Sequence, residues 1–214
     1  MRINVSKENQ KTTVTFKVSN GQGVNIPEYS SLKSAKKDLD KKGVKYNVVY
    51  TYDDIDDVDC SKGGAEFVGQ SDSGLIYKNN TIDLTVNKSS LSISEMDRKI
   101  NYVDGIDTYI TFKNTSNQAI YKTVFTVKYF DQVGNPANDE ISNKPTRLLK
   151  STTYLAPGAS TKSYWDAAIY NGDVAAVAPV SATVYFADDS EQNITFNGRY
   201  WYFDNFHGSS VDLR

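Results

Sequence analysis

Residues 30–52 read SSLKSAKKDLDKKGVKYNVVYTY, a helix signal followed directly by a strand signal. Apolar residues recur at i, i+3 and i+7 from Leu32, which places them on one face of a helix. A serine pair before Leu32 can cap the helix start, and Gly43 suits the left-handed conformation that ends a helix. Every second residue after Gly43 is then apolar or aromatic. We expect a helix over about 32–42 that lies on a small sheet.

The composition is that of a mostly β protein. The chain has 214 residues with 15 Tyr and 9 Phe, and aromatic and β-branched residues fit the half-buried surface of a sheet. This length allows one large or two small domains. The 39% hydrophobic and 23% charged residues are typical of a folded domain and not of a disordered chain.

Charge and cysteine content exclude several classes of protein. The 24 basic and 26 acidic residues give a net charge of −2, which argues against general binding to nucleic acid. One Cys and one His exclude a disulfide framework and a zinc site built from several Cys and His. No apolar run is long enough for a membrane span. We expect no cofactor.

Two strongly alternating stretches lie 68 residues apart, at 14–20 and 82–88. Alternation of apolar and polar residues predicts a half-buried strand at each place. The offset indicates a repeat, in which residues 1–21 contribute the last strand of a preceding unit or a linker. An added edge strand of the same small domain is the other interpretation, and at this point both stay open.

Residues 22–88 resemble a PASTA domain. The motifs that carry the resemblance are Ile26-Pro27, the helix ending at Gly43, Gly64, Gly69-Gln70-Ser71, Gly74 and a closing strand from Ile82 to Val86. The resemblance implies one helix on a three-stranded sheet, in an extracellular repeat whose usual ligand is peptidoglycan. We place this domain at 22–90. The chain departs from the pattern at Asp72 and Ser73, where prolines are expected, and over residues 51–63, which are longer and more acidic.

After a break in the pattern over about 87–105, the chain reads as short strands separated by turns. Alternating positions predict inward-facing sets of residues, while Asn-, Gly-, Pro- and Asp-rich segments mark the turns. The sets include Ile106, Thr108, Ile110 and Phe112; Thr123, Phe125, Val127 and Tyr129; and Val180, Ala182, Val184 and Phe186. Six or seven such strands favour an immunoglobulin-like β-sandwich over 91–214, closed by an aromatic C-terminal arm. This part is similar to Ig-like modules of unassigned function on Gram-positive surface proteins.

The acidic run 53–59 contains weak candidates for a metal site. Asp57, Asp59 and Ser61 have some of the spacing of a calcium loop. The glycine falls one position late and the ligand count is short, so we favour a solvated acidic loop.

Catalytic signals are sparse. Cys60 and His207 are one candidate pair of nucleophile and base, but they fall in different predicted domains and we favour a lone thiol in a loop. No motif for a serine nucleophile, a phosphate loop or a zinc protease occurs. A hydrolase using Asp or Glu stays open, because the spacing of such a pair is spatial.

Five aromatic residues crowd the stretch between residues 200 and 206. Arg199, Tyr200, Trp201 and Tyr202 are our candidates for ligand binding, since an exposed aromatic face can stack on sugar rings. A last strand that buries its faces on the two domains is the alternative, and we favour it. We also assign Trp165 to the core.

The resemblances together imply a non-catalytic extracellular module of a bacterial surface protein. Such a module binds or spaces itself within the cell wall, with peptidoglycan or another surface protein as partner. We expect it to contact the membrane only through an anchor that precedes residue 1. The alternatives are a carbohydrate-binding module with an exposed aromatic platform and an Asp/Glu hydrolase.

Overall fold

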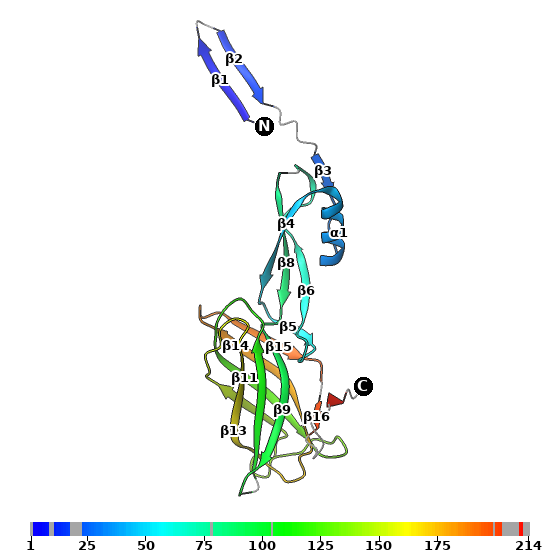
Figure 1. Ribbon diagram of the computed structural model, residues 1–214, viewed down its shortest axis with the longest axis vertical. Coiled ribbons are helices and arrows are strands. Elements are labelled where there is room, and N and C mark those ends of the chain that lie inside the picture. The colour runs from blue at the N-terminus through cyan, green and yellow to red at the C-terminus, as the bar shows by residue number, and fades with distance from the viewer. Residues whose placement is uncertain are drawn as a thin grey trace. The chain divides into compact units, whose positions relative to one another are not determined.

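The helix forms at the predicted place in the computed structural model, which describes residues 2–8, 11–17, 23–77, 79–103, 105–198, 200–202 and 210–211. α1 spans Leu32–Lys42 (Figure 1). The side chain of Ser31 accepts a hydrogen bond from the Ser34 amide, and Gly43 ends the helix at a φ of 65°. The predicted fold class, mainly β with one short helix on a small sheet, is confirmed.

The chain divides into two compact units, and the first contains residues 1–49 and 67–86. Its three-stranded sheet has the order β4-β8-β6, and β3 pairs with β7 in a second small sheet. These strands are β3 Gly23–Ile26, β4 Lys45–Thr51, β6 Ala65–Gln70, β7 Gly74–Tyr77 and β8 Thr81–Lys88. Ala35 and Leu39 of α1 are fully buried and share one apolar core with Ile82 and Leu84 of β8.

The predicted strand near residues 14–18 belongs to a two-stranded antiparallel ribbon. β2 (Lys11–Lys17) pairs with β1 (Arg2–Glu8) along its whole length. Among the strands that the structure describes, β2 has no other partner. The described strands therefore give no pairing of this segment with the sheets of the small domain, and its origin in a preceding repeat or a linker stays a prediction.

The second unit, residues 50–66 and 87–214, is a β-sandwich. One sheet has the order β13-β10-β9, and the other has the order β12-β11-β14-β15-β5 with β16 and β17 attached. Counted from β9, the first, second and fifth strands make one sheet and the third, fourth, sixth and seventh make the other, which is an immunoglobulin-like arrangement. The strands are β5 Ile55–Val58, β9 Leu91–Ile100, β10 Gly105–Asn114, β11 Ile120–Phe130, β12 Thr146–Ser151, β13 Ser160–Tyr170, β14 Ala176–Phe186, β15 Glu191–Phe196, β16 Tyr200–Tyr202 and β17 Ser210–Val211.

The predicted inward-facing positions of β10 and β11 are all buried in the sandwich. Val180 of β14 is an exception to the pattern, since it is 38% exposed. A β-bulge is the cause: Thr126 pairs with Ser181 while Val127 pairs with Pro179, so Val180 is skipped. The inward-facing residues of β14 beyond the bulge are buried as expected.

Residues 50–66, expected within the domain at 22–90, lie instead in the sandwich unit. β5 pairs in parallel with β15, and the apolar residues of β5 are in the sandwich core. Two buried amide side chains hold the segment. Gln192 donates to the Asp53 carbonyl over 2.7 Å, and Asn87 accepts from the Asp53 amide over 3.0 Å. The acidic run is therefore a strand flanked by anchored backbone and not a loop, while the side chains of Asp53, Asp54, Asp56 and Asp57 are exposed, as predicted.

No helix in the described part of the chain has the length and apolar character needed to cross a lipid bilayer.

Candidate functional site

The aromatic segment predicted as a binding platform is partly in the core. Trp201 is 5% exposed and packs among the buried residues of the sandwich, so it is not available to stack on a ligand. Its strand, β16, pairs with β14. Arg199 and the side chains of Tyr200 and Tyr202 lie outside the described residues. Trp201 therefore fits the alternative that we favoured, a last strand that buries side chains on the sandwich.

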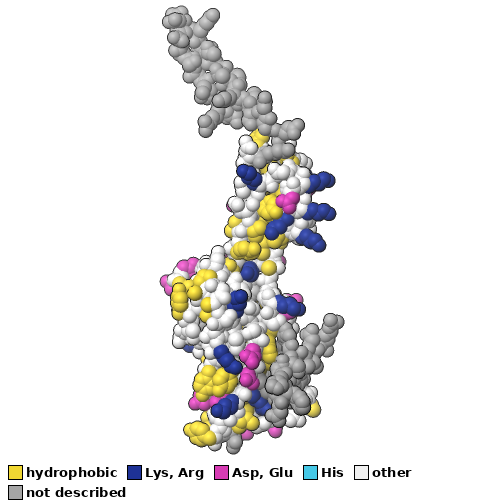
Figure 2. Space-filling view, in the orientation of Figure 1, with side chains coloured by type: hydrophobic (Ala, Val, Ile, Leu, Met, Phe, Trp, Pro, Cys, Tyr) yellow, Lys and Arg dark blue, Asp and Glu magenta, His cyan; other side chains and the backbone are white. Residues whose placement is uncertain are grey.

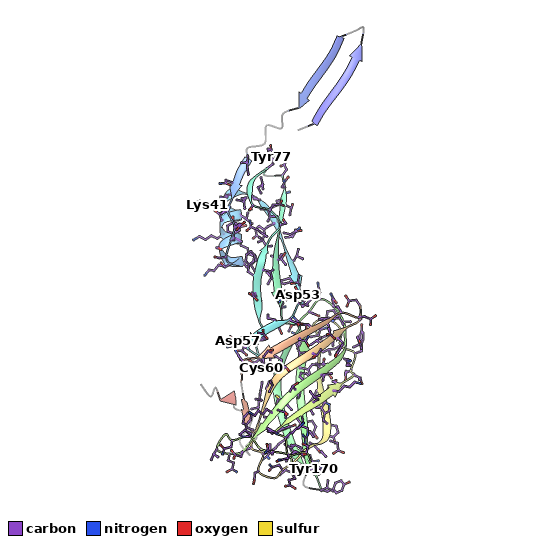
Figure 3. All side chains as sticks on the ribbon, turned by 180° about the vertical axis from the view of Figure 1, so that it is seen from behind. Lys41, Asp53, Asp57, Cys60, Tyr77 and Tyr170 are labelled. Carbon is purple, nitrogen blue, oxygen red and sulfur yellow. The ribbon has the colours of Figure 1, made fainter. Side chains whose placement is uncertain are left out.

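The weak metal candidates have other roles in the structure. Asp59 Oδ1 accepts hydrogen bonds from the Ser61 amide, the Ser61 hydroxyl and the Lys62 amide, at 2.7–3.2 Å. Its other oxygen lies 3.2 Å from Lys62 Nζ. Asp57 is exposed, with a left-handed φ of 55°, and lies within β5 (Figure 3). Within the described ranges, no three acidic, His or Cys side chains group as metal ligands.

Cys60 lies in the turn that follows β5, in agreement with the predicted place in a loop, but its side chain belongs to the core. Its side chain, labelled in Figure 3, is fully buried and belongs to the apolar core of the sandwich. His207 lies outside the described residues. The core prediction for Trp165 is confirmed in part: the side chain is partly buried and packs edge-on against Phe125 of the core, with ring centroids 6.1 Å apart. Its indole N–H donates to the Lys150 carbonyl over 2.9 Å.

A different pair of aromatic residues lies on the outer surface of the β13-β10-β9 sheet. Tyr109 and Tyr164 are directly opposite each other in the register of β10 and β13. Their ring centroids are 5.1 Å apart and the rings are tilted by 32°. Tyr164 is 52% exposed and Tyr109 is half-buried. We call these two residues and their charged neighbours, Glu95, Asp97 and Lys162, the tyrosine face.

Charged groups surround the two rings. Lys162 Nζ lies 5.4 Å from the centroid of the Tyr109 ring and 3.6 Å from Glu95 Oε2. The same Glu95 oxygen accepts a hydrogen bond from the Thr111 hydroxyl over 3.1 Å. Asp97 on β9 is opposite Tyr109 in the register of the two strands. The face therefore joins an aromatic surface to both donors and acceptors of hydrogen bonds.

A buried carboxylate supports one end of this face. Asp107 is 5% exposed and accepts hydrogen bonds from the Ala167 amide at 2.9 Å and from the Asn101 side chain at 3.0 Å. Burial alone would raise the pKa of Asp107, but these hydrogen bonds lower it below its usual range. Ala167 has a left-handed φ of 44°, and the pairing of β13 with β10 is irregular there. Asp107 thus fixes an irregular part of β13 close to Tyr164.

The surroundings of Tyr164 disfavour ionisation of its phenol. Partial burial and the negative charges of Asp107 and Asp166 raise the pKa of the Tyr164 phenol above its ordinary value. Like any tyrosine of ordinary pKa, Tyr164 is protonated at neutral pH and can donate a hydrogen bond, and a hydrogen bond with Asp166 is among the causes of its raised pKa.

The tyrosine face was missed at the level of sequence, although a signal was present. The prediction that Ile110 and Trp165 face inward places their chain neighbours, Tyr109 and Tyr164, on the outer surface. What the sequence does not contain is the register, which sets these two distant tyrosines opposite each other across neighbouring strands.

Comparisons with known proteins leave the family of the chain open. No protein-family model matches it, and no curated protein is significantly similar. A hypothetical protein from Peptoclostridium difficile 630 is structurally similar at 10% identity, with a TM-score of 0.34, over 48% of this chain and 85% of that one. A target of the Northeast Structural Genomics Consortium has 10% identity and a TM-score of 0.31, over 58% of this chain and 96% of that one. Likeness at this level assigns no function.

Proposed function

We propose that the chain is a non-catalytic extracellular module of a bacterial surface protein, and that its tyrosine face binds a glycan of the cell wall. The observation that carries the proposal is the pair of adjacent rings formed by the exposed Tyr164 and the half-buried Tyr109. The apolar C–H face of a sugar ring packs on aromatic rings, and such rings contribute much contact area at low entropic cost.

The neighbours of the pair suit the rest of a sugar. Glu95 and Asp97 offer acceptors to sugar hydroxyls, while Lys162 and the neutral phenol of Tyr164 offer donors. Groups of this kind, placed around an apolar surface, fix the orientation of a small ligand. The PASTA-like pattern at 22–90 and the Ig-like pattern at 91–214 agree with a cell-wall location, with peptidoglycan as the first ligand to test.

The buried acid nearest to the pair has a structural role. Asp107 accepts hydrogen bonds from the Ala167 amide and from Asn101, so its carboxylate holds the backbone of β13 in place. An acid engaged in this way favours a binding function over a hydrolase that uses Asp or Glu.

The proposal is tested by titrating the full chain with soluble muropeptides and with neutral glycans, followed by calorimetry and by NMR of the tyrosine rings. Tyr109→Ala and Tyr164→Ala are each expected to weaken binding about tenfold or more, corresponding to about 1.4 kcal/mol or more. Tyr154→Ala is the matched control, since Tyr154 is 66% exposed but lies outside the face.

Binding that all three variants retain would refute the tyrosine face as the site. Binding to neutral glycans alone would make the chain a general carbohydrate-binding module. No binding to either ligand class would leave a spacer or a protein-binding role within the wall.

A further inference from the structure

The outward surface of α1 carries a row of three lysines. Lys33, Lys37 and Lys41 are spaced at i, i+4 and i+8, and all three are exposed. They lie on a different face of the helix from the buried Ala35 and Leu39. Figure 2 shows Lys and Arg side chains gathered over this part of the molecule, and Figure 3 labels Lys41 on the helix. We call these three residues the lysine row.

The two acids of the helix are directed to other partners. Asp38 accepts a hydrogen bond from the Tyr29 hydroxyl over 2.6 Å and forms an ion pair with Lys42 at 2.5 Å. Partial burial and the carboxylate of Asp40 raise the pKa of the Tyr46 phenol, which places Asp40 beside that tyrosine.

The lysine row itself is left without such partners. Within the described part of the chain, none of Lys33, Lys37 and Lys41 has an acidic group within ion-pair distance. α1 therefore presents three cations along one line without an ion pair to an acidic group of the described residues, although the charge of Lys41, like that of Lys42, helps to lower the pKa of Asp38.

The row does not help the helix to form. Like charges at i and i+4 repel each other and disfavour an isolated helix. The caps at Ser31 and Gly43 and the buried leucine and alanine supply the stability that the row does not. An anionic ligand lying along the row would relieve the repulsion.

We propose that the lysine row binds a linear polyanion whose negative groups repeat along its length. Residues four apart on a helix are separated by about 6 Å along the axis, so a polymer of repeating phosphates or carboxylates can meet several lysines at once. A single small anion on this convex surface can meet few of them. None of the large exposed apolar residues of the described chain lies on α1, so the row lacks the anchors typical of a protein interface.

Two polymer probes test the proposal and distinguish a ligand with repeating phosphates from one with repeating carboxylates. Long-chain polyphosphate and polygalacturonate are titrated into the full chain across a range of salt concentrations, and backbone amide shifts are followed by NMR. Engagement of three lysines predicts a slope of log K against log salt of roughly −2 to −3. Shifts of the α1 amides should accompany binding.

The decisive variant is the triple substitution Lys33→Gln, Lys37→Gln and Lys41→Gln. It should remove most of the salt dependence and reduce affinity at low salt by at least tenfold. A control with Lys99, Lys113 and Lys144 changed to Gln has the same net charge and should bind like the parent chain. The amide spectra of both variants without ligand report whether α1 stays folded.

Equal losses in the two triple variants, shifts confined to residues outside α1, or no binding of either probe would overturn the proposal. If just one of the two probes binds, the proposal is supported, and the probe that binds assigns phosphate or carboxylate as the chemistry of the natural polymer. The outcome does not depend on the tyrosine face, because the triple variant leaves Tyr109 and Tyr164 intact.

Discussion

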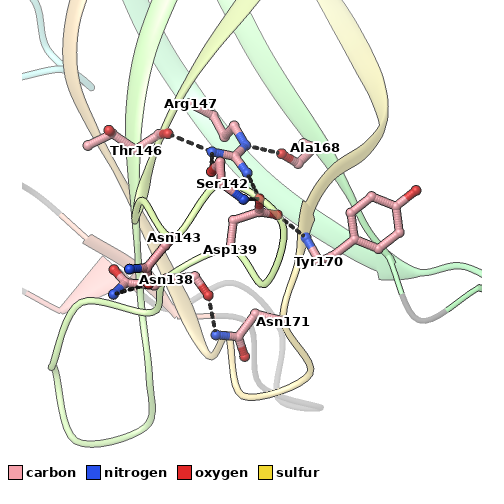
Figure 4. A network of polar contacts seen from close by, with 9 residues as sticks. All are labelled: Asn138, Asp139, Ser142, Asn143, Thr146, Arg147, Ala168, Tyr170 and Asn171. Carbon is pink, nitrogen blue, oxygen red and sulfur yellow. Dashed lines mark hydrogen bonds and ion pairs between the residues drawn. The ribbon is translucent and has the colours of Figure 1, made fainter.

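Replacing Asp139 should destabilise the sandwich more than an ordinary surface change does. Asp139 is 2% exposed and accepts hydrogen bonds from the Tyr170 amide at 2.8 Å and the Ser142 amide at 2.7 Å (Figure 4). It also forms an ion pair with Arg147, whose guanidinium donates to the Ala168 carbonyl over 2.9 Å. One carboxylate thus joins the loop before β12 to the end of β13.

Asp139→Ala removes the acceptor for two amides and leaves a largely buried guanidinium without its counter-ion. Breaking a buried ion pair by removing one partner costs about 3–5 kcal/mol. The additional change Arg147→Met removes the uncompensated charge, so the double variant should lose about 1–3 kcal/mol less than the sum of the two single losses.

Urea unfolding followed by tryptophan fluorescence measures these losses. Both tryptophans of the chain, Trp165 and Trp201, belong to the sandwich unit, so the signal reports on that unit. A loss for Asp139→Ala below about 1 kcal/mol, close to the range of surface substitutions, would refute the reasoning.

The same network predicts a dependence on pH. Burial alone would raise the pKa of Asp139, but the Tyr170 and Ser142 amides and Arg147 lower it well below the usual range. A carboxyl whose pKa is depressed by folding stabilises the native state above the unfolded pKa of about 3.9. That contribution should be fully present at pH 6 and decline as the pH falls below about 4, so the stabilities of the parent and of Asp139→Ala should converge in acid.

Three other outcomes follow from buried positions. Trp201→Ala should cost about 3–5 kcal/mol in urea unfolding, because the side chain is in the core. Gln192→Leu should cost about 1–3 kcal/mol or more in urea, because it leaves the buried Ser90 amide without its acceptor at 2.9 Å. Carboxyl NMR titration of Asp59 should give a pKa of about 2: burial alone would raise it, but hydrogen bonds from Ser61 lower it.

Local signals predicted the elements that local interactions determine. The helix bounds, its serine cap and its C-terminal Gly43 depend on residues within a few positions of one another, and all are confirmed. The inward positions of β10 and β11 follow from period-2 alternation and are likewise confirmed. In each case a single short pattern specifies both the element and its buried face.

Where the alternation of apolar and polar residues is interrupted, the sequence did not predict the strand. β9 (Leu91–Ile100) fell in a stretch that we interpreted as a break, because its alternation changes between Ile93 and Met96. The structure shows why: Phe112 pairs with Ile93 but Thr111 pairs with Glu95, so a bulge inserts one residue into β9. A bulge is defined by the partner strand, and its position is not evident from one strand alone.

Long-range polar contacts explain why the acidic run was assigned to the small domain, whereas it belongs to the sandwich unit. The backbone at Asp53 and Asp54 is held by Asn87 and by Gln192, which is 139 residues away from Asp53. Asp54 in turn accepts a hydrogen bond from the Asn193 amide over 2.8 Å. In the sequence the carboxylates of this run suggested a solvent-exposed or metal-binding role, whereas the fold uses mainly its peptide groups and its apolar residues. The backbone that a buried amide recognises has no characteristic side chain, so this kind of anchoring leaves little trace in composition or spacing.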